Sequence, residues 1–132
     1  MTDMTHTTEQ VQDYMARVPK SLVRYLEDEV LPRYDHFDPA HQRDHARSVM
    51  QRSMAMGAHY ADTDAGMLLT AAACHDLGLC EGRATHHLVS GRIVRADHRL
   101  RQWFDGAQIE VIAEAAEDHR ASAIVRRAPF MA

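Results

Sequence analysis

AGMLLTAAACHDL, residues 65–77, is the most apolar stretch of the chain and decides its fold class. Two residues that can cap a helix, Asp62 and Thr63, precede this stretch, and Gly78 follows it. An apolar segment with such ends favours a helix that is buried on most of its sides. Its inner part, residues 66–74, is about half of the ~20 residues that a membrane-spanning helix needs. We therefore expect the central helix of a soluble domain.

Helical periodicity continues on both sides of this stretch, whereas the alternating pattern of a half-buried strand is scarce. Residues 8–18 have apolar side chains at helical spacing, and Pro19 suits the first turn of a second helix, which should end at Pro32. Asp38 followed by Pro39 is typical of a helix start. Gly78 and Gly82 should bracket a loop. Further helices are expected at residues 41–60, at residues 85–96, in a short segment with Leu100, Trp103 and Phe104, and at residues 107–119.

The sequence thus predicts an all-α fold, a single-domain bundle of about six to seven helices in 132 residues. We expect the core of the domain to span residues 18–122. Residues 1–17 would add an extra N-terminal helix, and residues 123–132 would form a short irregular tail.

Composition narrows the classes of function. The formal net charge is −4, from 15 basic and 19 acidic residues, and no basic block occurs, so binding to nucleic acid or to a membrane surface is not expected. The N-terminal MTDMTHTTEQ lacks the basic start and apolar run of a secretory signal, which favours a cytoplasmic location. Two cysteines are too few for a disulfide framework. Ten histidines are unusual for this length and direct attention to metal chemistry.

Two histidine arrangements have the spacing of metal ligands. His41 and His45 are four residues apart and share one face of the expected helix. The pair His75–Asp76 lies at the end of the apolar helix, where a lone carboxylate would be costly to bury unless it is paired or binds a cation. An ion pair with an arginine, or a polar helix end, would explain Asp76 equally well.

The order of these residues resembles the HD-domain superfamily of metal-dependent phosphohydrolases. The series is His45, then His75–Asp76 followed by Leu77–Gly78, then His87 with Gly91 four residues later, then His119. The segments AHQRDH, CHDLGLCEGRATHHLVSG and AEDHRAS are similar to those of small stand-alone HD proteins. The resemblance covers most of the chain, from about Val18 to Ser122.

The resemblance implies a metal centre and a reaction. His45, His75 and Asp76 would bind a divalent cation, while His87 and His119 would complete a second metal site or face the substrate phosphate. Imidazole and carboxylate together suit Mn²⁺, Fe²⁺, Ni²⁺, Co²⁺ or Zn²⁺, with Mg²⁺ less favoured. The expected activity is hydrolysis of a small phosphorylated metabolite, in particular a nucleotide, by metal-activated water that attacks phosphorus.

Other polar residues near these motifs are candidates for the same chemistry. Arg83 and Arg120 would balance the charge of the phosphate, although solvated surface residues are the alternative. Glu81 would act with Asp76 in catalysis, as a general base or by orienting the attacking water. The spacing to Gly91 favours His87 as the inward residue, which leaves His86 at the rim as a substrate contact.

The chain departs from the family pattern at its end. HD proteins add a further Asp ligand after the last histidine, and no Asp or Glu follows Asp118 here. The site would then be weakened, or Asp118 would substitute, or water or a partner subunit would complete the metal's shell. An apolar face left uncovered would favour a homodimer. The alternative function is a catalytically weak HD domain that serves as a metal- or nucleotide-binding sensor or interaction module. A third interpretation is an inert helical bundle whose histidines are coincidental.

Overall fold

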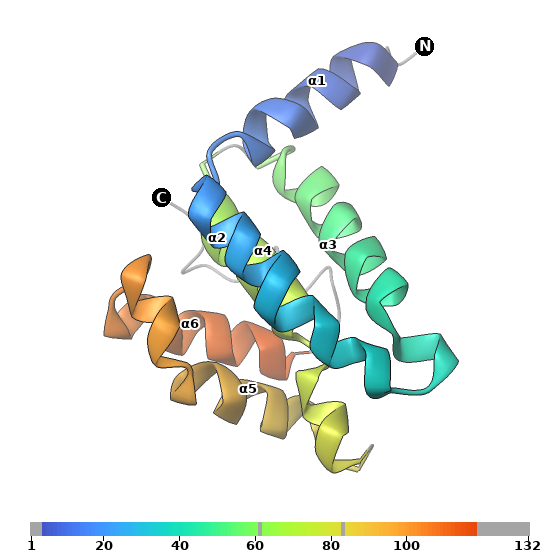
Figure 1. Cartoon of the computed structure of the whole chain (residues 1–132). Helices are drawn as coiled ribbons and strands as arrows, with labels where there is room; N and C mark the ends of the chain where they lie inside the picture. Colours follow the sequence, from blue (N-terminus) through green and yellow to red (C-terminus); the bar gives the residue numbers. More distant parts are fainter. Residues whose placement is uncertain (1–3, 61, 83, 119–132) are drawn as a thin grey trace.

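The computed structural model describes residues 4–118 apart from 61 and 83. Within this part of the chain there are six α-helices and five short 3₁₀ or π segments, and no strand (Figure 1). The expected all-α bundle is therefore confirmed. The α-helices are α1 (Met4–Met15), α2 (Lys20–Tyr25), α3 (Arg43–Gly57), α4 (Ala65–Cys74), α5 (His86–Ala96) and α6 (Gly106–Glu117). The short segments are η1 (Leu26–Val30), η2 (Leu31–His36), η3 (Pro39–His41), η4 (Leu77–Glu81) and η5 (His98–Gln102).

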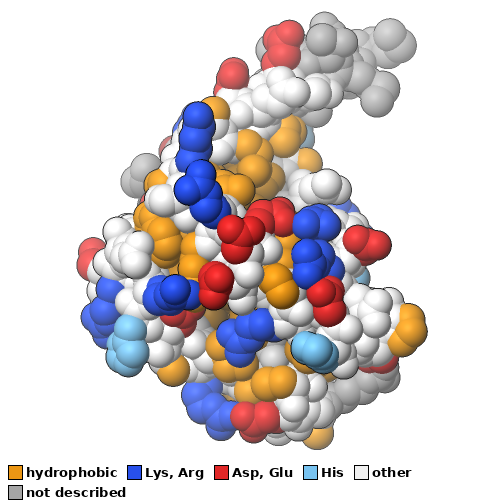
Figure 2. Space-filling model, in the orientation of Figure 1, with side chains coloured by type: hydrophobic (Ala, Val, Ile, Leu, Met, Phe, Trp, Pro, Cys, Tyr) orange, Lys and Arg blue, Asp and Glu red, His pale blue; other side chains and the backbone are white. Residues whose placement is uncertain are grey.

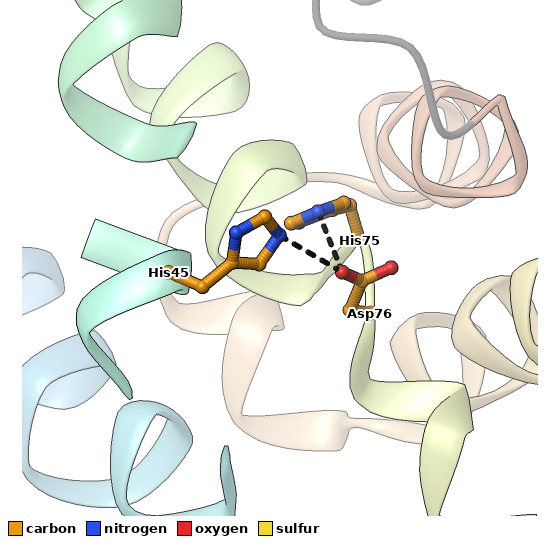
Figure 3. Close-up of side chains that lie close together, drawn as sticks. All are labelled: His45, His75 and Asp76. Carbon is orange, nitrogen blue, oxygen red and sulfur yellow. Dashed lines mark ion pairs between the residues drawn. The ribbon is translucent and has the colours of Figure 1, made fainter. Parts of the chain in front are cut away.

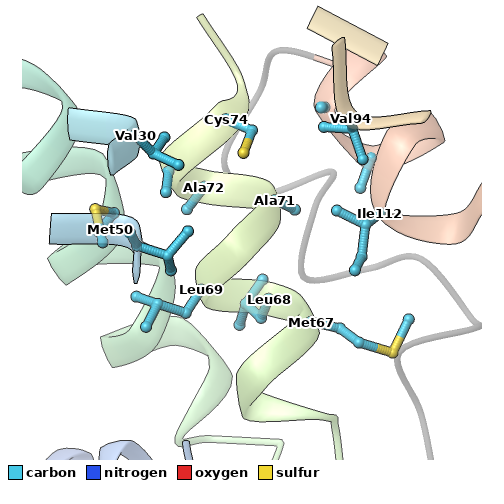
Figure 4. Close-up of a cluster of buried hydrophobic side chains, with 14 of the residues drawn as sticks. Val30, Met50, Met67, Leu68, Leu69, Ala71, Ala72, Cys74, Val94 and Ile112 are labelled. Carbon is cyan, nitrogen blue, oxygen red and sulfur yellow. The ribbon is translucent and has the colours of Figure 1, made fainter. Parts of the chain in front are cut away.

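Helix α4 is the centre of the bundle, as its composition predicted. Every one of its residues is buried. Figure 4 shows its side chains between Val30 and Met50 on one side and Val94 and Ile112 on the other. Its N-cap is Asp64, whose side chain accepts the backbone N–H of Met67, rather than either of the two residues expected from the sequence. Full burial of α4 fixes where its C-terminal end, and hence the His–Asp pair, lies in the fold.

The remaining helices form layers around α4. Helix α3 packs on one side, and α5 and α6 pack together on another (Figure 1). Arg95 of α5 bridges Glu110 and Glu117 of α6 at 2.7 Å each. On the face seen in Figure 2 acidic and basic side chains lie next to one another, with hydrophobic side chains between them.

Helix α1 projects from the body of the bundle in Figure 1, but its C-terminal end belongs to the core. Tyr14 is 1% exposed, and its hydroxyl lies 2.5 Å from Oγ1 of Thr63, which in turn donates to the carbonyl of Tyr60. The hydrophobic core therefore includes a residue before position 18, which belongs to the helix that the sequence predicted as an N-terminal addition.

Several segments differ from the sequence expectation at their ends. Pro32 does not end the helical region, since the chain passes from α2 through η1 into η2, with Pro32 in the first turn of η2. A proline is tolerated there because the first N–H groups of a helical segment need no partner within it. Residues 78–81 are not a loop but part of the 3₁₀ segment η4, and its C-cap Gly82 has a φ of +98°. Among the described helices, none has both the length and the apolar character needed to cross a membrane.

Candidate metal centre

The candidate centre lies where α4 ends. Tyr34 of η2 is fully buried beneath this end, and its hydroxyl donates to the carbonyl of Ala73 at 2.6 Å and accepts the N–H of Asp76 at 3.3 Å. One side chain thereby holds the last turn of α4 and Asp76, two residues beyond the end of the helix. Burial raises the pKa of Tyr34 well above its ordinary value, which keeps this hydroxyl protonated as a donor.

Three side chains converge at this point from two segments (Figure 3). Nε2 of His75 lies 3.0 Å from Oδ2 of Asp76, and Nε2 of His45, on α3, lies 3.4 Å from the same oxygen. One ligand atom from each of the three residues lies within 4.8 Å of the others, and no other group of three or more such residues occurs in residues 4–118 as described. His75 and Asp76 are buried, whereas His45 is partly exposed, so the cluster has one side open to solvent.

His75 has an acceptor at each of its ring nitrogens. Nδ1 lies 2.7 Å from the carbonyl oxygen of Ala72, which can only accept, so Nδ1 carries the proton. A neutral imidazole then has a bare lone pair at Nε2, 3.0 Å from the carboxylate of Asp76. The contact is favourable only if His75 gains a second proton or a cation is shared by Nε2 and Oδ2. The donor set thus fits a divalent metal ion, and the carbonyl contact is the kind that orients metal-binding histidines.

The pKa shifts in the cluster favour the metal-binding forms of two side chains. Burial lowers the pKa of His45, with a further decrease from the nearby charges of His75 and His41, against an opposing effect of Asp76. Burial alone would raise the pKa of Asp76, but positive charge on the surrounding imidazoles outweighs burial, first of all that of a cationic His75, which also donates a hydrogen bond to the carboxylate, so the pKa is lowered. Ionised carboxylate and neutral imidazole are the forms that coordinate metal ions.

A fourth side chain approaches the other oxygen of this carboxylate. Nε2 of His86, in the first turn of α5, lies 3.4 Å from Oδ1 of Asp76. The sequence pattern favoured His87 as the inward residue, but the structure directs His86 toward Asp76. Its neighbour His87 is half-buried and packs edge-on against the ring of His86, with 5.7 Å between ring centroids.

The packing of α5 against η4 explains why His86, and not His87, lies near Asp76. Gly78 donates its N–H to Oγ of Ser90, and that hydroxyl donates to the carbonyl of His86. A Cβ at Gly78 would lie 1.8 Å from the His86 carbonyl oxygen, so only glycine permits this approach of η4 to α5. The sequence HDLG contained the signal, because a glycine two residues after the Asp marks a close backbone contact, but it could not say which histidine the contact would orient.

A second feature missed by sequence reasoning is the support of His45. The side chain of Asp38 caps η3 through the N–H of Ala40, as expected, and also lies 2.9 Å from Nδ1 of His41. The His41 ring packs edge-on against His45, with 5.5 Å between their centroids. Asp38 and His41 therefore form a support beside one of the three clustered residues.

Among the described residues, Glu81 and Asp118 do not join the cluster of three. Glu81 is exposed and forms an ion pair with Arg92, so it is not placed as a base beside Asp76. Asp118 follows α6 as its C-cap and is half-buried. Arg83, His119 and Arg120, as well as the expected tail, lie outside the described residues.

Comparisons of the chain with protein-family models, with curated proteins and with solved structures found no match.

Proposed function

We propose that the chain is a metal-dependent phosphohydrolase of the HD-domain type, acting on a small phosphorylated metabolite such as a nucleotide. The observation that carries the proposal is the surrounding of one buried carboxylate by three imidazoles, from α3, from the end of α4 and from α5. The double-acceptor environment of His75 supports a cation in particular. The order of the motif residues in the sequence supports the reaction class.

His45, His75 and Asp76 are the residues that would hold the ion, with His86 at the second carboxylate oxygen. When bound, a divalent ion would lower the pKa of a water molecule and offset charge on the phosphoryl oxygens. The protein's own contribution is rigidity: Tyr34 fixes the backbone of Asp76, and the Ala72 carbonyl fixes the ring of His75. The partly exposed side of His45 leaves access for a substrate.

Metal analysis of the purified protein and of two variants tests the proposal. Asp76→Asn keeps the shape of the buried side chain and removes its charge, while Asp44→Asn removes an exposed carboxylate next to His45 on α3. After incubation with Mn²⁺, Ni²⁺ or Zn²⁺, the unchanged protein and Asp44→Asn should each retain about one equivalent of metal per chain, and Asp76→Asn should lose it. The metal should also raise the melting temperature of the first two proteins only.

Release of inorganic phosphate from nucleoside monophosphates, measured with the same samples, tests the reaction. Phosphate release that requires the metal and Asp76 supports a hydrolase. Metal binding without release from a broad set of phosphate esters would instead favour the metal-binding sensor. If Asp76→Asn leaves the metal content unchanged, the site is assigned wrongly.

A further inference from the structure

A pocket of about 360 Å³ lies between η2 and η4, beginning at the residue next to Asp76. Its lining is Pro32, Arg33, His36, Phe37, Leu77 and Cys80. In Figure 1 this is the region where the turquoise η2 and the yellow η4 approach each other below α4. Its volume is near the lower limit of small-molecule sites, which run from about 300 to 1,000 Å³.

Two links connect the pocket with the cluster of His45, His75 and Asp76. One is the covalent chain, and the other is a hydrogen bond. Leu77 lines the pocket and directly follows Asp76 in the chain. Tyr34 lies between the lining residues of η2 and accepts the backbone N–H of Asp76. The end of the pocket at Leu77 is therefore the end nearest to Asp76 along the chain.

The lining combines apolar surface with basic side chains. Pro32, Phe37 and Leu77 supply apolar walls. Arg33 and His36 are three residues apart in a 3₁₀ segment, where side chains at this spacing project from the same side. Arg33 is exposed and has no ion pair with a carboxylate in the described part of the chain.

We propose that this pocket holds the organic group of a phosphate monoester of nucleoside size, and that Arg33 binds an oxygen of its phosphate. The proposal rests on the function proposed above and narrows its substrate class. A guanidinium presents paired donors that match phosphate oxygens, and the apolar walls suit a flat ring. A volume of about 360 Å³ suits one nucleoside better than a dinucleotide. Arg33 is thus a further candidate for the role that the sequence predicted for Arg83 and Arg120, both of which lie outside the described residues.

The exposed thiol of Cys80 reports on the pocket without any need for turnover. Cys80 lines the pocket, whereas Cys74 is buried in the core, so N-ethylmaleimide should label Cys80 alone in the folded protein. The labelling rate is measured by mass spectrometry on metal-loaded protein with adenosine, adenosine 5′-monophosphate or inorganic phosphate. Adenosine contains no phosphate ester, so its effect is independent of hydrolysis.

Adenosine monophosphate at about four times its dissociation constant should slow labelling about fivefold, and adenosine should protect more weakly. The variant Arg33→Gln should lose the advantage of the monophosphate over adenosine but keep the protection by adenosine, which a misfolded protein would not. Arg101→Gln, an exposed arginine of η5, is the control and should behave like the unchanged protein.

The outcomes separate this proposal from the proposed function. Protection of Cys80 without phosphate release would support the pocket and overturn the hydrolase. Phosphate release with no protection by either adenosine compound would support the hydrolase and overturn the pocket. Protection by inorganic phosphate alone, equal to that by the monophosphate, would also overturn the pocket, since only an anion would then be recognised.

Discussion

Nε2 of His86 lies 3.4 Å from Oδ1 of Asp76, whereas the Nε2 atoms of His45 and His75 lie near the other carboxylate oxygen, Oδ2. Both oxygens of this buried carboxylate are therefore faced by imidazole nitrogens. A carboxylate held in this way has little freedom to rotate, and its orientation is set by three separate segments of the chain. The arrangement makes the role of His86 the sharpest question about the centre.

We expect His86→Ala to lower metal affinity by about tenfold or more, because groups that ligate or orient a metal-binding carboxylate contribute at this scale. His87→Ala is the matched control, since it removes a neighbouring half-buried imidazole from the same turn of α5. Titration with Zn²⁺ or Ni²⁺, followed by calorimetry, measures both. A larger loss in His87→Ala than in His86→Ala would restore the register favoured by the sequence pattern.

Gly78→Ala should destabilise the protein by about 3 kcal/mol, since the new methyl group would collide with the backbone of α5 and neither segment can yield locally. Gly106→Ala, in the first turn of α6, meets no atom within 4 Å and should leave the free energy of unfolding nearly unchanged. Urea denaturation of both variants provides the measurement. Equal stability of the two would mean that η4 and α5 are not in such close contact.

Tyr34→Phe should cost about 1–3 kcal/mol, because the Ala73 carbonyl and the Asp76 N–H would lose a buried partner. The same variant should bind metal more weakly, since the backbone of Asp76 is no longer fixed. Tyr25→Phe removes a hydroxyl that bonds Asp97 at a partly buried position, and it should leave metal affinity unaltered. Should both variants bind metal equally well, Tyr34 supports the fold and not the centre.

Ser53→Ala is expected to keep or increase stability. Its hydroxyl is fully buried in α3 and is the single buried side-chain polar atom without a hydrogen-bond partner among the described residues. Removing an unpaired buried hydroxyl relieves a desolvation cost, and alanine has the higher helix propensity by about 0.5 kcal/mol. Thermal unfolding compares the variant with the unchanged protein, and a clear fall in melting temperature would indicate a partner for this hydroxyl.

Local sequence pattern was sufficient for the helices and for one part of the centre. The run of α4, apolar apart from Thr70, favoured burial on all sides, and this placed His75 and Asp76 at a buried helix end. The prediction that His41 and His45 share one helix face is wrong, because His41 ends η3 and α3 begins at Arg43, although their rings are in edge contact. The inferences that succeeded depend on residues that are near one another in the chain.

Contacts between segments that are distant in the chain could not be predicted from the sequence pattern. Whether His86 or His87 turns inward depends on how α5 rotates against η4, and the contact at Gly78 fixes that rotation. Likewise, nothing near Arg33 in the sequence connects it with the end of α4, because the link runs through Tyr34 across the core.

The sequence by itself determined the all-α fold, the central helix and the buried His–Asp pair, since hydrophobic periodicity and the cost of burying a charge are local properties. Tertiary structure alone decided which imidazoles surround Asp76, where Glu81 points and which side chains line the adjoining pocket. The physical reason is that side-chain direction at these positions is set by the packing of helices far apart in the chain, and no local pattern records that packing.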